Sequence, residues 1–428
     1  MSRLLPTATG YVALCDVEGV AFEFYQPRHI AGGSQGGWWC DLSILSKLPG
    51  QEGILHEGRH NLSSLTTKTA LSKYLQGRAP DLDWDSVIAQ VFLDVILRLR
   101  EGLPSIVLGN REPRPPTYRI DKLVQDNQFT IWYGEKDSGK SMMALAAAYA
   151  VTEGSDILGL PVRPGCVWYL DWETDEDTQA QRLQWLARAA GARVLPPVRY
   201  KRMERGLADE VDTLRREMGE TIRAATEEVP GLEGAMVIVD SLGFACGGSL
   251  KEEEAARQFL AAARTLDCAV LAIGQTRKPQ PGEKRRHFSV YGSTFFEYAA
   301  RSLWRIQASR DTDEPSFDLG FYHEKSNNSR RFRPIGYRVQ VDDANETICI
   351  RPQDVRVVPE LAEGRPLGER LVEALLGGAL TVRELADVLE TSRGSIEGTV
   401  GRLRQSGKVR LVAYDGREAR YGAAAPTT

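Results

Sequence analysis

Eight consecutive residues combine two glycines, a lysine and a hydroxyl at a spacing that suits the binding of a phosphate group. They are Gly134-Glu135-Lys136-Asp137-Ser138-Gly139-Lys140-Ser141, which fit the pattern G-x-x-x-x-G-K-[ST] at every fixed position. The glycines let successive backbone N–H groups curl around a phosphate without a side-chain clash. Lys140 would then reach the β- and γ-phosphates, and the Ser141 hydroxyl would ligate Mg²⁺. The stretch therefore predicts a site for ATP with Mg²⁺, contacted by all eight residues.

Two strands predicted elsewhere end in acidic residues that would complete this chemistry. The apolar run 166–170 is followed by Asp171-Trp172-Glu173, and the run 235–239 is followed by Asp240. Because the carboxyl ends of parallel strands border the phosphate crevice, we expect Asp240 to hold Mg²⁺ through its water shell. Glu173 is the candidate for polarising the attacking water. A solvated acidic turn is the alternative for Glu173, because residues 175–177 are also acidic.

A further apolar run, residues 269–273, is followed by Gly274-Gln275-Thr276. Gln275 is a candidate catalytic residue that would sense the γ-phosphate and pass its presence to the next loop. That loop is rich in Pro and Gly and is basic, so it could grip the phosphate backbone of DNA. An ordinary solvated loop is the alternative. The basic residues predicted to contact DNA there are Lys278, Lys284, Arg285 and Arg286.

The elements that must position these residues form a strand–turn–helix unit around the phosphate-binding stretch. Residues 129–133 are apolar and β-prone, and residues 142–148 are strong helix formers. The helix N-terminus would add partial positive charge beside the phosphates. This context disfavours a chance match of the motif. Alternation of strands and helices over residues 118–359 predicts an α/β core with a mainly parallel sheet.

Composition limits the class of protein. The chain has 428 residues, of which 42% are hydrophobic and 26% charged, as in soluble globular proteins. The net charge of −4 means that any contact with nucleic acid must come from local basic patches. Six cysteines without a C-x-x-C pair indicate reduced thiols. No signal peptide and no apolar run of transmembrane length occur, so we expect a cytoplasmic protein with no membrane partner.

Residues 1–105 predict a small α+β domain whose role the sequence does not indicate. Its predicted elements are a hairpin over residues 11–25, a strand at 38–40, and helices over 64–77 and 84–101. His56 and His60 lie four residues apart without an evident third ligand, so they do not predict a metal site. A Pro-rich linker at 109–116 follows.

The order of the motifs resembles the RecA-like ATPases, specifically the branch of RepA-type hexameric helicases and their phage-borne relatives. The matching segments are GEKDSGKS, VWYLDWE, VIVDSLGFACGGS, LAIGQTRKP and YGSTFFEYAARSLWRI, which lie within residues 118–340. The resemblance implies that Glu173 is the catalytic glutamate and that the protein is a homo-oligomer, a hexamer, with single-stranded DNA in its ring. This branch often has histidine where Gln275 stands, so the sensor role of Gln275 stays open.

The same resemblance implies a basic residue that acts on a neighbouring subunit. RecA-like rings place a Lys or Arg after the strand predicted at 317–323, where it reaches the neighbour's γ-phosphate. Lys325 matches that position, with Arg330 or Arg331 as a companion. A cation acting in this way stabilises the charge that develops in the transition state. An exposed basic turn is the alternative.

Residues 365–425 predict three helices, over 367–376, 381–389 and 392–406, followed by a hairpin that turns at Asp415-Gly416. This pattern resembles a winged helix-turn-helix. Duplex DNA would contact Arg393 and Arg402 on the third helix and Arg417 on the wing. We expect that helix to expose Ser395, Thr399 and Arg404 as well. Such domains also dock proteins, and this alternative stays open.

The favoured interpretation is an Mg²⁺-dependent ATPase that couples hydrolysis to DNA binding or translocation in replication or recombination, as a helicase or helicase-like protein. A second interpretation is a RecA-like recombination mediator that forms filaments on single strands. A third is a regulatory ATP-binding switch whose winged helix recruits a partner protein.

Overall fold

The computed structural model describes residues 3–6, 10–16, 18–30, 36–101, 107, 112, 115–228, 234–249, 252–276, 289–292, 294–310, 314–416 and 418–424. The chain forms two compact units, one of residues 1–115 with 209–219, and one of residues 116–208 with 220–428. The domain boundaries predicted near residues 105 and 365 stay predictions.

The first unit contains a five-stranded antiparallel sheet whose strands follow one another in chain order. The sheet packs on two helices, and aromatic rings contact one another in its core, such as Phe24 and Phe92, whose ring centroids lie 5.9 Å apart. The predicted hairpin, the strand at 38–40 and both helices are present. The elements are β1 (Arg3–Pro6), β2 (Gly10–Cys15), β3 (Val20–Ile30), β4 (Gly37–Ser46), β5 (Gly53–Asn61), α1 (Leu65–Gln76) and α2 (Trp84–Glu101).

His56 and His60 both lie on β5, and their Nε2 atoms approach to 2.6 Å. Their rings meet over Gly58, where an added Cβ would lie 3.2 Å from one Nε2 and 3.3 Å from the other. Burial lowers the pKa of each imidazole. Over the part of the chain that the structure describes, no group of three or more His, Cys, Asp or Glu residues could hold a metal ion.

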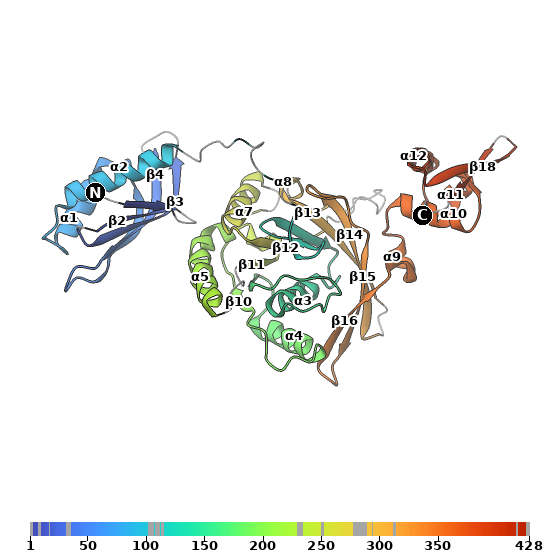
Figure 1. Ribbon diagram of the computed structural model, residues 1–428, viewed down its shortest axis with the longest axis horizontal. Coiled ribbons are helices and arrows are strands. Elements are labelled where there is room, and N and C mark those ends of the chain that lie inside the picture. The colour runs from blue at the N-terminus through green and yellow to red at the C-terminus, as the bar shows by residue number, and fades with distance from the viewer. Residues whose placement is uncertain are drawn as a thin grey trace. The chain divides into compact units, whose positions relative to one another are not determined.

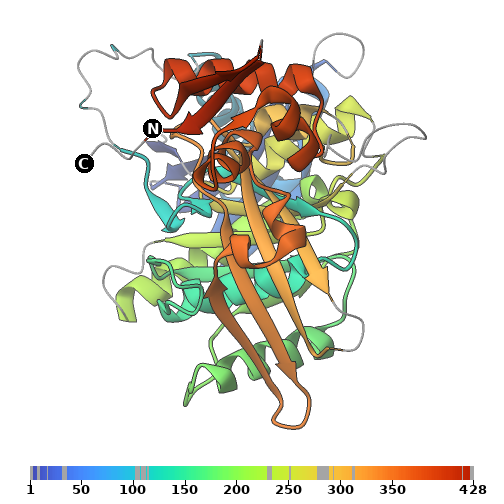
Figure 2. The same ribbon diagram turned by 90° about the vertical axis from the view of Figure 1, so that its right-hand side faces the viewer.

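The second unit is built on a nine-stranded sheet of order β10-β9-β11-β12-β8-β13-β14-β15-β16. The pairs from β10 to β13 are parallel, and the pairs from β13 to β16 are antiparallel. The mostly parallel sheet predicted from the alternation of elements is therefore confirmed. Figure 2 shows the long antiparallel strands β14–β16 side by side. The strands are β8 (Phe129–Gly134), β9 (Cys166–Asp171), β10 (Arg199–Arg202), β11 (Ala235–Asp240), β12 (Ala269–Gln275), β13 (Ser302–Arg310), β14 (Ser316–Ser326), β15 (Ile335–Asp342) and β16 (Thr347–Gln353).

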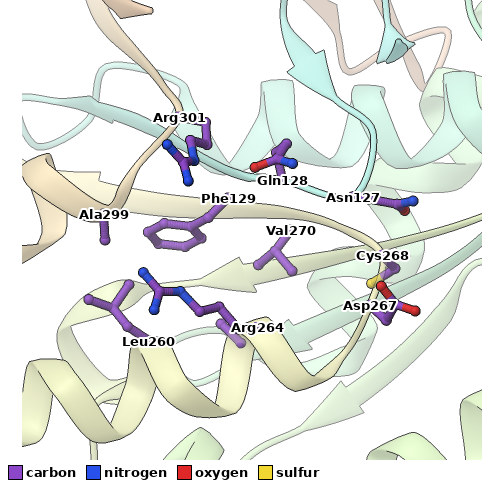
Figure 3. Close-up of a pocket in the computed structure, with 11 residues that line it drawn as sticks. Asn127, Gln128, Phe129, Leu260, Arg264, Asp267, Cys268, Val270, Ala299 and Arg301 are labelled. Atoms are coloured by element: carbon purple, nitrogen blue, oxygen red, sulfur yellow. The ribbon is translucent and has the colours of Figure 1, made fainter. Parts of the chain in front are cut away.

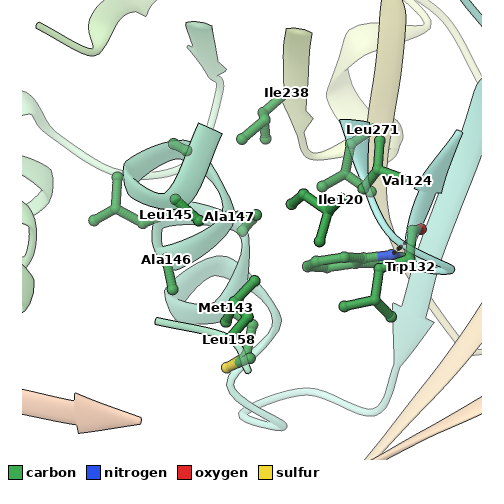
Figure 4. Close-up of a cluster of buried hydrophobic side chains, with 14 of the residues drawn as sticks. Ile120, Val124, Trp132, Met143, Leu145, Ala146, Ala147, Leu158, Ile238 and Leu271 are labelled. Atoms are coloured by element: carbon green, nitrogen blue, oxygen red, sulfur yellow. Dashed lines mark hydrogen bonds between the residues drawn. The ribbon is translucent and has the colours of Figure 1, made fainter. Parts of the chain in front are cut away.

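One face of this sheet is covered by α3 (Lys140–Glu153), which directly follows the phosphate-binding stretch (Figures 1 and 4). Its small side chains let the helix approach the strands closely, and residues 143–151 of the helix are all buried. Leu271 and Trp132 face this helix from neighbouring strands, and the Trp132 indole N–H donates to the Leu123 carbonyl at 3.4 Å. Burial on both faces explains the continuous apolar runs of these strands.

Helices α4, α6 and α7 also pack on this sheet (Figure 1), whereas residues 209–219 of α5 belong to the first unit. Phe259 of α7 contacts Phe129 and Phe296 with ring centroids at 5.9 and 6.0 Å. The Asp175 carboxylate caps α4 by accepting the Thr178 N–H at 2.8 Å. The helices are α4 (Glu176–Ala189), α5 (Leu207–Glu228), α6 (Leu242–Ala245), α7 (Glu253–Thr265) and α8 (Thr294–Ala299), and a small hairpin is made by β6 (Tyr118–Ile120) and β7 (Val124–Gln125).

The C-terminal segment contains the three predicted helices and the predicted hairpin, which we call the C-terminal module (residues 367–423). The predicted capping box is confirmed, since the side chains of Thr381 and Glu384 each accept a backbone N–H of the other residue. A short strand, β17, adds to the hairpin to give the sheet β17-β19-β18. The elements are η2 (Val355–Val357), α9 (Pro359–Ala362), α10 (Leu367–Leu376), β17 (Leu380–Thr381), α11 (Val382–Val388), α12 (Arg393–Gln405), β18 (Val409–Asp415) and β19 (Glu418–Ala423).

The expectation that Thr399 is exposed on the third helix is wrong. Thr399 is only 4% exposed, beside the buried residues Ile396 and Val400 of α12. Its hydroxyl donates to the Ser395 carbonyl at 2.8 Å, which satisfies the buried polar group within the helix. Arg393, Ser395 and Arg402 are exposed as expected.

No helix among the described residues is both long enough and apolar enough to cross a membrane.

Candidate active site

The phosphate-binding stretch forms the turn between β8 and α3, and its two glycines are required by packing. A Cβ on Gly134 would lie 2.4 Å from the Ile306 carbonyl oxygen of the neighbouring strand β13. Gly139 has φ +76°, and a Cβ there would lie 2.9 Å from the Phe317 ring. Asp137 also has a positive φ of 60°, so the turn is strongly curved. The sequence motif thus has the strand–turn–helix context that phosphate binding needs.

Lys140 is 9% exposed, and its ammonium group folds back over the turn. It donates to the Glu135 carbonyl and, at 3.2 Å, to the Ser138 hydroxyl oxygen. Burial lowers the pKa of Lys140, while the charges of Asp240 and Glu173 act in the opposite direction. A buried cation over a curved loop of N–H groups is suited to a polyanionic ligand.

Asp240 lies at the end of β11, directly beside Asp171 at the end of β9. The Tyr169 hydroxyl donates to the Asp240 carboxylate at 2.6 Å. Burial raises the pKa of Asp240 to about 6, while hydrogen bonds from Tyr169 and Ser141 act to lower it. Ser141 therefore acts on the Asp240 carboxylate, as expected if the two predicted Mg²⁺ ligands belong to one site.

Glu173 accepts a hydrogen bond from the Ser241 hydroxyl, which directly follows Asp240 in the chain. The turn that carries Glu173 is held by Asp171, whose carboxylate accepts the N–H groups of Glu173 and Thr174 at 2.8 and 2.9 Å. Asp175, by contrast, is used in capping α4. The structure thus brings Glu173 to the Asp240 strand end and gives the neighbouring acid Asp175 a structural role.

The residues present fit Mg²⁺ and a nucleotide. Ser141 and Asp240 supply oxygen atoms, the ligand type that Mg²⁺ prefers, and Mg²⁺ commonly uses one or two protein ligands beside phosphates and water. Gly134 and Gly139 let the turn keep its strong curvature against Ile306 and Phe317, which a side chain at either position would prevent. Both observations favour the predicted cofactors.

Gln275 is the exposed last residue of β12 and pairs in register with Gly134. Its carbonyl accepts the Tyr291 N–H at 2.7 Å, and Thr276 forms an isolated bridge with Val290. The base of the predicted basic loop therefore lies next to the phosphate-binding turn. Lys278, Lys284, Arg285 and Arg286, predicted to contact DNA, lie outside the described residues.

Lys325 is bound within its own chain. Its ammonium donates to the carbonyls of Glu297, Tyr298 and Ala300, the last two at 3.0 and 2.9 Å. These carbonyls belong to the C-terminal end of α8, so Lys325 caps that helix. Burial lowers the pKa of Lys325. A role on a neighbouring subunit's phosphate would require the ammonium to leave these carbonyls.

The arginines predicted to contact duplex DNA make local contacts in the C-terminal module. Arg393 pairs with Glu397 at 3.1 Å, and Arg402 donates to the Thr399 hydroxyl oxygen at 3.2 Å. Arg417 lies outside the described residues.

The sequence analysis did not identify Tyr169 and Ser241, which are the direct hydrogen-bond partners of Asp240 and Glu173. Both lie within two residues of the acidic ends of β9 and β11, and this position in the sequence could have indicated their role.

A separate cavity, shown in Figure 3, lies at the opposite end of the parallel strands. It is lined by Phe129 and Val270, near the starts of β8 and β12, whereas the phosphate-binding turn follows the end of β8. Arg264 and Arg301 flank the Phe129 ring there. This cavity contains none of the predicted site residues.

Comparison with known proteins gives one family match. Residues 100–281 match the family AAA_25, described as an AAA domain. No curated protein matches the chain. The matched residues contain the phosphate-binding turn and the acidic ends of β9 and β11, so with the geometry of the site the match supports a P-loop ATPase.

Two solved structures are similar to the chain at low identity. The flagellar accessory protein FlaH from Methanocaldococcus jannaschii is 13% identical, with 53% of this chain and 90% of that chain covered and a TM-score of 0.33. The KaiC-like protein PH0186 from Pyrococcus horikoshii OT3 is 14% identical, with 56% of this chain and 99% of that chain covered and a TM-score of 0.34.

Proposed function

We propose that this protein is an Mg²⁺-dependent ATPase that couples hydrolysis to DNA binding or translocation in replication or recombination, in the manner of RepA-type helicases. The observation that carries the ATPase part is the placement of four residues at the carboxyl ends of three parallel strands of one sheet, β8, β9 and β11. Lys140 and Ser141 begin α3 after β8, Asp240 ends β11, and Glu173 follows β9 and contacts the residue after Asp240.

Each residue has a distinct task in the proposed reaction. Lys140 and the turn N–H groups hold the phosphates, and Glu173 orients the attacking water and accepts its proton. Asp171 keeps the Glu173 turn in place through the two backbone N–H groups that it accepts. Ser141 and Asp240 would hold Mg²⁺, which when bound supplies positive charge to the β- and γ-phosphate oxygens.

The coupling to DNA is supported by the place of Gln275 and Thr276, after which the basic segment continues in the sequence. Because Thr276 donates its N–H to the Gly134 carbonyl at 3.1 Å, the first residue of the loop base is bonded to the phosphate-binding turn. A change at the γ-phosphate would move Gln275 and with it the loop that follows. The basic residues at 278–286 would then change their grip on a phosphate backbone.

The C-terminal module would act as a winged helix on duplex DNA. Its three helices and three-stranded sheet suit this role, and Arg393 and Arg402 are exposed on α12.

Assembly into a ring would place a cation of one subunit at the ATP of the next, with Lys325 as the predicted residue. If Lys325 acts between subunits, mixing Lys325→Ala protein with Lys140→Ala protein should restore part of the ATPase activity. Subunit exchange between the two proteins must first be established. If exchange occurs and no activity returns, Lys325 only caps α8.

The function is tested by measuring ATPase activity with increasing single-stranded DNA at several salt concentrations. We expect DNA to stimulate the activity and the apparent DNA affinity to fall steeply as salt increases, because phosphate contacts release counterions. A variant with Lys278, Lys284, Arg285 and Arg286 all changed to Ser should keep basal ATPase activity and lose the stimulation. ATPase activity that no DNA alters at low salt would contradict the coupling and favour a regulatory ATP-binding switch.

A further inference from the structure

A partly buried charged cluster joins the phosphate-binding strand to the segment that leads into the C-terminal module. Tyr133, the residue before Gly134, donates its hydroxyl to one oxygen of Glu324 at 2.9 Å. The other oxygen of Glu324 accepts from Arg305 Nε at 2.7 Å, and Arg305 Nη2 donates to the Gly364 carbonyl at 3.1 Å. The Arg305 side chain is 6% exposed and lies over the Tyr322 ring at 4.4 Å. A short series of bonds therefore links the nucleotide site to Gly364.

Further bonds fix the same segment against the surface of β13 and β14. The Tyr322 hydroxyl donates to the Leu361 carbonyl, and Gln307 Nε2 donates to the Glu360 carbonyl at 2.8 Å. A Cβ on Gly364 would lie 2.5 Å from the Tyr322 ring, so the backbone approaches the strands as closely as glycine allows. Residues 360–364 are thus anchored beside the phosphate-binding turn, and they lead directly into α10 (Figure 1).

A cavity of about 960 Å³ lies between this anchored segment and the phosphate-binding turn. One wall is formed by residues 135–138 of the turn and by β13, and the other by residues 360–365 with residues of α10 and 388–390 of the C-terminal module. Its volume is within the range of sites for small molecules and cofactors. Its lining mixes apolar side chains with basic and acidic ones, which suits a polar aromatic ligand.

Of the four arginines among the described residues that line this cavity, Arg310 stacks on an aromatic ring that also contacts the phosphate-binding turn. Arg310 lines the cavity, and its guanidinium lies over the Phe317 ring at 3.9 Å. The same Phe317 ring packs against Gly139 of the turn, where an added Cβ would lie 2.9 Å from it. A guanidinium that already stacks on one aromatic ring can present its other face to a nucleobase. The cavity thus offers a stacking surface next to the phosphate site.

We propose that this cavity receives the nucleoside of the bound nucleotide and that residues 360–390 form its outer wall, so that nucleotide binding and the position of the C-terminal module depend on each other. The proposal rests on the ATPase function proposed above and adds to it a means of regulation. ATP that fills the cavity contacts both walls, whereas a ligand of phosphates alone contacts only the turn. By reciprocity, a partner or DNA that holds the module against the turn would tighten ATP binding.

The first test compares ATP with tripolyphosphate, which fills the phosphate site without a nucleoside, by calorimetry in the presence of Mg²⁺. Arg310→Met should weaken ATP binding about tenfold, the scale of one lost stacking contact, and leave tripolyphosphate binding unchanged. Arg351→Met is the matched control, because Arg351 is an exposed arginine on β16 that does not line the cavity. Equal ATP binding by Arg310→Met and wild type, or an equal loss for both ligands, would overturn the nucleoside assignment.

The second test measures backbone hydrogen exchange of the full-length protein. ATP should slow exchange at residues 360–365 and 388–390, and tripolyphosphate at saturation should not. Equal protection by the two ligands, or none from bound ATP, would overturn the proposed wall. Lys140→Ala separates this failure from failure of the proposed function: if that variant binds both ligands as wild type does, the phosphate site itself is wrongly assigned.

Discussion

Replacing Asp240 with Asn should stabilise the protein in the absence of nucleotide and Mg²⁺ while removing its activity. Asp240 is 3% exposed, and burial raises its pKa from 3.8 to about 6, with the charges of Asp171 and Glu173 adding to the effect. The folded state therefore binds the Asp240 proton more tightly than the unfolded state does. The ionised carboxylate, present at neutral pH, costs folding free energy that the neutral amide of Asn would not.

The size and pH dependence of this effect follow from linkage. A shift of about two pKa units corresponds to about 3 kcal/mol, at about 1.36 kcal/mol for each unit. Below pH 4 the aspartate is protonated in both states, and wild type and variant should be equally stable. As pH rises from about 4 to about 6 the wild type loses this contribution, so the variant should be up to about 3 kcal/mol more stable at pH 7–8. The Tyr169 hydroxyl can still donate to the Asn oxygen.

The assay is urea unfolding of both proteins from pH 4 to pH 8 in a chelating buffer. Asp171→Asn is the matched control, because the Asp171 carboxylate accepts three N–H groups, including one from Gln179 at 2.8 Å, and its replacement should destabilise the protein. A variant Asp240→Asn that is less stable than wild type at pH 8, or a stability difference that does not change with pH, would refute the reasoning.

Two further predictions concern the residues around the nucleotide. Glu173→Gln should keep ATP binding and lower kcat by about a hundredfold or more, which is the scale of a lost general base. Asp175→Asn should hydrolyse ATP at the normal rate. The reverse result in single-turnover ATPase assays would show that the wrong acid was chosen. Lys325→Ala should lower the free energy of unfolding by about 1–3 kcal/mol, because three carbonyls at the end of α8 lose their donor. Arg331→Ala, at an exposed arginine, should change it little, and equal thermal unfolding of both variants would contradict the capping role.

Local sequence determined the parts of the site that lie within one strand–turn–helix unit. Gly134 and Gly139 could be predicted because their roles depend on backbone conformation and close approach, which the motif encodes. The capping box at Thr381 could also be predicted from the sequence, since Thr381 and its partner Glu384 lie only three positions apart. Asp240 could be placed because a buried strand that ends in one acid puts that acid at the sheet edge.

Features that depend on distant segments could not be predicted. Glu324 meets Tyr133 across 191 positions of sequence, and no local pattern in either strand indicates the pairing. Lys325 finds its carbonyl partners on α8, about 25 residues earlier, so its capping role depended on tertiary packing. Thr399 is a different case, because its spacing from Ile396 and Leu403 follows the buried face of the helix and the periodicity itself predicts burial.

The central claim, that residues 134–141 bind and hydrolyse ATP with Mg²⁺, is tested most directly by the Lys140→Ala variant. Circular dichroism and thermal unfolding should first establish that the variant folds as the wild type does. Steady-state ATPase assays with Mg²⁺ should then give clear turnover for the wild type, none above background for the variant, and none for either protein when EDTA removes the metal. A correctly folded Lys140→Ala protein with wild-type ATPase activity would contradict the account.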